Sequence, residues 1–86
     1  MHDLHEADKI TKLILEYAKK NNLKNVKSAT VELGSVIEHG EEITPENLVF
    51  NIKMLAEGTI AEGLDVKIGK IKTDSWNLKE IEGDKN

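Results

Sequence analysis

The three histidines, His2, His5 and His39, are the residues of this chain whose types and positions indicate the most specific chemistry. A free amino group on Met1 and the imidazole of His2 both lose their protons near neutral pH, so both become metal ligands easily. The backbone amides of His2 and Asp3 can also lose their protons to a metal that prefers a square-planar set of nitrogens, which means Ni(II) or Cu(II). The first three residues therefore predict a four-nitrogen metal site.

His5 and His39 are the candidates for an additional ligand. The better-known terminal copper and nickel motif carries its histidine in third place, where the chelate rings close more easily. A histidine in second place needs help from the backbone geometry, or leaves a position for another ligand. His5 can reach the same ion if the first helix begins near Asp3. The alternative for all three histidines is a solvated side chain at a frayed end, on a helical turn or in an acidic loop.

Composition excludes several other classes of protein. The 86 residues carry 12 Lys, no Arg and 16 Asp plus Glu, for a net charge of −4, which argues against nucleic acid and anionic membrane surfaces as partners. The absence of Cys removes disulfides, thiolate zinc sites and thiol nucleophiles. There is no long apolar run, basic leader, phosphate loop or nucleophile–base pair, so we expect a cytoplasmic domain that is not an enzyme.

The elements that must position these residues begin with an amphipathic helix from Leu4 to about Asn21. Asp3 is its expected N-cap, and Glu6 completes a capping-box-like pair. Its buried side should hold the apolar residues that recur at steps of three and four, namely Ala7, Ile10, Leu13, Ile14, Tyr17 and Ala18.

The rest of the chain reads as strand, helix, strand, strand. Alternating residues predict a strand over 26–33, and a surface loop follows over 35–43. Thr44 and Pro45 open a second helix that ends near Gly58. Two strands should follow, 64–68 and 76–81, joined as a short antiparallel hairpin, with residues 83–86 frayed. This order predicts an α+β fold, with both helices on one face of a small three-stranded mixed sheet whose first two strands are parallel.

Three stretches together resemble HypA, the nickel-insertion accessory protein of nickel–iron hydrogenase maturation. They are the opening Met1-His2-Asp3-Leu4 before an amphipathic helix, the strand ending Val31-Glu32-Leu33-Gly34, and the run Leu-Ala-Glu-Gly-Thr-Ile-Ala-Glu-Gly over 55–63. The resemblance covers roughly residues 1–70.

The resemblance implies a nickel metallochaperone domain. It places Ni(II) on Met1, His2 and Asp3, through the terminal amine, the imidazole and backbone amides. His5 or His39 is our own candidate for an extra ligand, and the family pattern does not require His39. Asp3 stands where the family usually has Glu. A HypB-type GTPase and a hydrogenase large subunit are the implied partners, and relatives of the family also serve urease. The alternative is a HypA-like adaptor or regulatory module that has lost metal handling, and a homodimer through an exposed sheet edge stays open.

One departure from the family is large. Its members carry a second, zinc-binding domain with two CxxC pairs, and this chain has no Cys. Residues 70–75 occupy the expected insertion point, and a tight turn there should join the two flanking strands. We therefore expect a single domain over 1–86 that binds nickel and no zinc.

Overall fold

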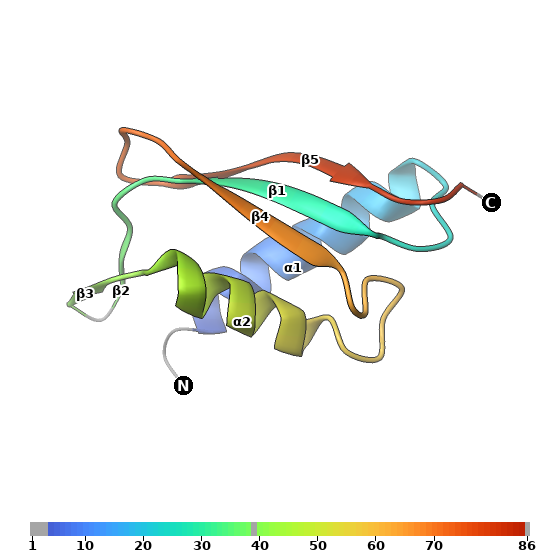
Figure 1. Ribbon diagram of the computed structural model, residues 1–86, viewed down its shortest axis with the longest axis horizontal. Helices are drawn as coiled ribbons and strands as arrows, with labels where there is room; N and C mark the ends of the chain where they lie inside the picture. Colours follow the sequence, from blue (N-terminus) through green and yellow to red (C-terminus); the bar gives the residue numbers. More distant parts are fainter. Residues whose placement is uncertain (1–3, 39, 86) are drawn as a thin grey trace.

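Two helices cover one face of a three-stranded sheet in the computed structural model, which describes residues 4–38 and 40–85 (Figure 1). The helices are α1 (Leu4–Lys20) and α2 (Pro45–Leu55). The sheet contains β1 (Ser28–Leu33), β4 (Asp65–Lys70) and β5 (Trp76–Glu82), and a separate two-stranded hairpin is formed by β2 (Ile37–Glu38) and β3 (Glu41–Glu42). The predicted α+β fold, with both helices on one side of a small mixed sheet, is confirmed.

The core lies between the helices and the sheet. Every second residue of β1 is buried there, as the alternation predicted, and the helices contribute large aliphatic side chains that include Ile10, Ile14, Leu48 and Ile52. Each such side chain stabilises the fold by roughly 1.5–3 kcal/mol relative to its exposure. The predicted buried side of α1 is wrong at Tyr17, which is 38% exposed, because the last turns of α1 border a surface groove.

The strand order β4-β1-β5 corrects the predicted hairpin. β4 and β5 are not paired, because β1 lies between them, parallel to β4 and antiparallel to β5. The connection over 71–75 crosses the end of β1 instead of making a tight turn. Its backbone is held there by hydrogen bonds from Ile71 N to Leu33 O (3.0 Å), from Gly34 N to Ser75 O (2.9 Å) and from Ser35 N to Thr73 O (2.7 Å).

The loop predicted over 35–43 contains regular structure. β2 and β3 pair as a short antiparallel hairpin with Ile37 opposite Glu42. Ile43 N donates to Val36 O at 2.8 Å, and the Ile43 side chain is buried, so the base of the hairpin is attached to the core.

The predicted start of the second helix is confirmed. Thr44 is the N-cap of α2, with its side-chain oxygen accepting a hydrogen bond from Asn47 N at 3.2 Å, and Pro45 is the first helical residue. The C-cap is Ala56. The sequence favours Gly58 as the residue directly after the cap, but Gly58, with a φ of 81°, lies two residues beyond Ala56.

Candidate metal centre

The candidate ligands lie mostly outside the described residues. Met1, His2, Asp3 and His39 belong to that part of the chain, and so does the predicted cap of α1 by Asp3. His5 is described, and its side chain is exposed on the first turn of α1. The terminal site therefore stays a prediction. The structure describes the first turn of α1, which directly follows the candidate ligands Met1, His2 and Asp3.

The first turn of α1 is tied to the start of β5. The indole nitrogen of Trp76 donates to Glu6 Oε1 at 2.6 Å, and the other carboxylate oxygen lies 3.8 Å from Lys9 Nζ. The Glu6 side chain is only 18% exposed. The sequence analysis missed this contact because 70 positions separate the two residues and no local pattern relates them.

No second cluster of metal ligands competes with the terminal site in the part of the chain that the structure describes. Within residues 4–38 and 40–85, no three His, Asp or Glu side chains come close enough to hold a metal ion. The paired carboxylates Glu41 and Glu42, for instance, lie exposed on β3.

The stretch over 56–63, the most specific part of the family resemblance, has a structural role. The Thr59 hydroxyl donates to Ala56 O at 2.6 Å and accepts from Ala61 N at 3.0 Å, while Gly58 N donates to Glu62 Oε1 at 3.0 Å. Ile60 O also accepts a hydrogen bond from the backbone just before β1. These contacts shape the connection between α2 and β4, which gives the stretch a structural role.

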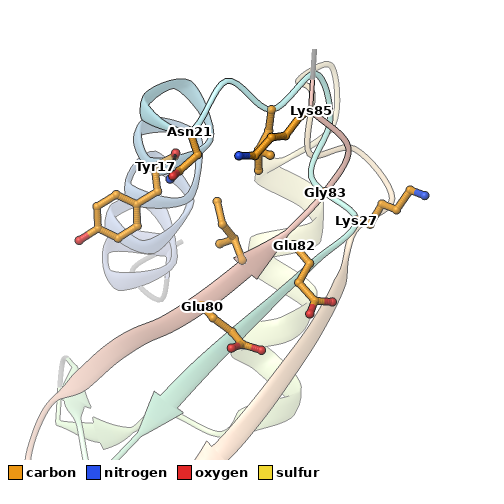
Figure 2. A pocket seen from close by; sticks show the side chains of 9 residues that line it. Tyr17, Asn21, Lys27, Glu80, Glu82, Gly83 and Lys85 are labelled. Carbon is orange, nitrogen blue, oxygen red and sulfur yellow. Dashed lines mark hydrogen bonds between the residues drawn. The ribbon is translucent and has the colours of Figure 1, made fainter.

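A groove of about 740 Å³ lies between the end of α1 and the end of β5. Figure 2 shows Asn21 and Lys85 near its upper end, with α1 on one side and β5 on the other. Tyr17, at its rim, is thirteen residues from Leu4, roughly 20 Å along the helix axis. The groove is therefore remote from the first turn of α1, which carries His5.

Residues 83–85 are held against the segment before β1 by hydrogen bonds and an ion pair. The prediction that these residues are frayed is therefore wrong. Asn25 Nδ2 donates to Asp84 Oδ2 at 3.2 Å, Asn25 Oδ1 accepts from Asp84 N at 2.9 Å, and Lys27 Nζ lies 3.2 Å from Asp84 Oδ2. The side-chain hydrogen bonds from Asn25 and Lys27 lower the pKa of the Asp84 carboxyl below its ordinary value of 3.8.

The contacts of Asp84 with Asn25 and Lys27 predict a small contribution to stability that is lost in acid. Because the pKa of Asp84 is lower in the folded state than in the unfolded state, its carboxylate stabilises the fold above pH 3.8, and this contribution disappears as the pH falls through the folded-state value. Asp84→Asn should therefore lower the urea midpoint at pH 7, and the difference from wild type should shrink at more acidic pH. Asp74→Asn, at an exposed aspartate of the 71–75 connection, is the control. A deficit of Asp84→Asn that stays constant down to pH 2 would contradict the assignment.

No helix in the described part of the chain is both long and apolar enough to cross a membrane. No protein-family model matches the chain.

The relatives in sequence are hydrogenase maturation factors. HypA of Methanothermobacter thermautotrophicus is 38% identical over 63 residues, which cover 73% of this chain and 48% of that protein. HypA of Pyrococcus furiosus is 34% identical, over 94% of this chain and 61% of that protein. This chain thus spans about half to three fifths of the length of these curated relatives.

The fold has a solved counterpart. The solution structure of the Ni metallochaperone HypA from Helicobacter pylori superposes with a TM-score of 0.80 at 13% sequence identity, and the alignment covers the whole of both chains. At this identity the match concerns the fold, and it agrees with the two-helix, three-stranded architecture described above.

Proposed function

Starting from the confirmed resemblance of this chain to HypA, we propose that it is a nickel-binding metallochaperone domain that acts in hydrogenase maturation. The observation that carries the proposal is the sequence Met1-His2-Asp3, in which a histidine follows Met1 and stands two residues before Leu4, the first residue of α1. The named relatives are maturation factors or a metallochaperone, which supports delivery of an ion over catalysis of a reaction.

The proposed site consists of the Met1 amine, the His2 imidazole and the amides of His2 and Asp3. α1 begins at Leu4, so its internal hydrogen bonds do not engage the amides before that residue. The metal can therefore take these nitrogens without unwinding the helix. His5, exposed on the first turn, supplies an axial ligand or replaces one during transfer, and His39 is the second residue proposed for this role.

Such a site suits a carrier. A terminal chelate with open axial positions releases Ni(II) more readily than a closed cage of four side chains. The proposal includes a HypB-type GTPase and the large subunit of a hydrogenase as partners, in the cytoplasm. It includes no zinc, since the chain has no Cys and residues 71–75 form only a short crossing connection between β4 and β5.

Titration of Ni(II) by calorimetry tests the proposal on two forms of the protein. One has a free Met1 amine, and the other carries two extra residues before Met1. We expect one site in the first form and an affinity at least about 100-fold lower in the second, because the extension turns the amine ligand into an amide. Circular dichroism should show the same fold in both.

Two outcomes would contradict the proposal. Equal binding by both forms would place the nickel ligands away from the terminus. Absence of binding in both would remove the nickel function and favour the adaptor or regulatory module.

A further inference from the structure

We infer that Trp76 and Glu6 are positioning residues of the proposed nickel site, with the Trp76 indole holding the first turn of α1 in the orientation that metal binding requires. The inference rests on the proposed function. Neither residue is assigned as a nickel ligand. Both act through the placement of the residues that precede and follow Leu4.

The contact between them is strong. The distance from Trp76 Nε1 to Glu6 Oε1 is 2.6 Å, at the short end for a hydrogen bond to a carboxylate. The bond is partly buried, which protects it from competition by water. The other neighbour of the carboxylate, Lys9, is 3.8 Å away and its side chain is 55% exposed, so the indole is the principal partner.

The bond to Trp76 attaches the first turn of α1 to the sheet. Among the helix residues whose burial is described, Ala7 is the first buried one. Before that point His5 is exposed, and Glu6 carries the hydrogen bond to the sheet. Helix ends fray where tertiary contacts are few, so loss of this bond should loosen the turn that carries His5 and follows His2.

Trp76 is itself held rigidly. It is the first residue of β5 and lies opposite Leu33 in the antiparallel register with β1. The residue before it, Ser75, accepts a hydrogen bond from Gly34 N at 2.9 Å. The first turn of α1 is thereby attached to the central strand of the sheet.

A nickel site that begins with histidine in second place has a specific need for such a support. Its chelate rings close less easily than those of the third-place motif, so part of the geometry must come from the backbone around it. A pre-ordered first turn reduces the conformational entropy that is lost when the metal binds. Residues that orient metal ligands without touching the metal typically change the affinity by about 10–100-fold when they are replaced.

The test compares four variants by calorimetric Ni(II) titration, with the planar Ni(II) absorption band as a second readout. Trp76→Phe keeps the aromatic ring and removes the donor, while Glu6→Leu removes the acceptor. Both should bind one Ni(II) with about tenfold lower affinity, and the band should reach the same final intensity at higher nickel concentration. Glu6→Gln retains a carbonyl acceptor and should restore the affinity to within about threefold of wild type.

Asn77→Ala is the matched control. It removes a side-chain hydrogen bond of 3.0 Å to Glu32 from the next position of the same strand and should leave the affinity unchanged. All titrations are made at a temperature where thermal unfolding curves show every variant to be folded, and the pair Glu6→Leu and Glu6→Gln suffices if Trp76→Phe does not fold.

Wild-type affinity in both Trp76→Phe and Glu6→Leu would overturn the inference and leave the nickel function intact. An equal loss in Asn77→Ala, or no recovery in Glu6→Gln, would also overturn it, because the effect would then be general destabilisation. Absence of nickel binding in the wild type would instead overturn the proposed function.

Discussion

Replacing His2 by alanine is expected to abolish stoichiometric Ni(II) binding and to leave the fold unchanged. The imidazole is the one side-chain ligand of the proposed terminal set, and the remaining amine and amides cannot complete four nitrogens. We expect the affinity to fall by at least about 100-fold, since removal of a ligand exceeds the roughly 10–100-fold effect of losing a residue that only orients one. His2 precedes α1, so the thermal unfolding midpoint of the metal-free protein should not change.

The fluorescence of Trp76, the only tryptophan, offers a second measurement. Its indole touches Glu6 on the first turn of α1, so Ni(II) bound at Met1, His2 and Asp3 should quench it in the wild type and not in His2→Ala. His5→Ala and His39→Ala are the matched controls and should weaken binding much less. Unchanged affinity in His2→Ala together with loss in His39→Ala would move the site to the β2–β3 hairpin.

Gly34→Ala, at the residue directly after β1, is expected to destabilise the protein. A β-carbon at this position would lie 2.2 Å from Thr73 O and 2.6 Å from Thr73 Oγ1. The obstacle is largely backbone, and it belongs to the connection that crosses the end of β1. Since that connection is held by the hydrogen bonds of Gly34 N and Ser35 N, it cannot withdraw without losing them. We expect the free energy of unfolding to fall by about 1–3 kcal/mol, as for other overpacked sites.

Gly69→Ala is the control for this prediction. Gly69 lies in β4, where an added β-carbon meets nothing within 4 Å. This substitution should be neutral or stabilise the protein by up to about 1 kcal/mol, because alanine loses less conformational entropy on folding. Urea denaturation gives the free energy of unfolding of both variants. Equal values would contradict the prediction, because they would show that the connection over 71–75 can shift to accommodate the added methyl group at no cost in stability.

The parts of the fold that depend on neighbours in the chain could be predicted from the residues alone. The steps of three and four in α1, the alternation of β1 and the Thr44-Pro45 start of α2 are each specified within a few residues. The parallel pairing of β1 with β4 also followed, because a strand, a helix and a second strand in one sheet favour that connection. The candidate nickel ligands were read from the sequence in the same way, since an amine, an imidazole and two amides from three consecutive residues need no distant partner.

Tertiary structure decided what depends on residues far apart in the chain. The short segment between β4 and β5 predicted a hairpin of these two strands. Instead, β1 lies between them, because the segment crosses the end of β1 and forms hydrogen bonds with the backbone there. The antiparallel register of β1 and β5 shifts between Thr30 and Val31, which no local pattern indicated. The burial of α1 was overestimated at Tyr17, since periodicity gives the side of a helix that turns inward and not how far the sheet extends beneath it.

The same division applies to the candidate site. The ligands proposed at Met1, His2 and Asp3 are a property of the sequence, because their chemistry resides in one continuous segment. Their support, the bond of 2.6 Å between Trp76 and Glu6, exists only in the folded chain. It joins the first turn of the first helix to the start of the last strand, and only the packing of α1 against the sheet brings these two side chains together.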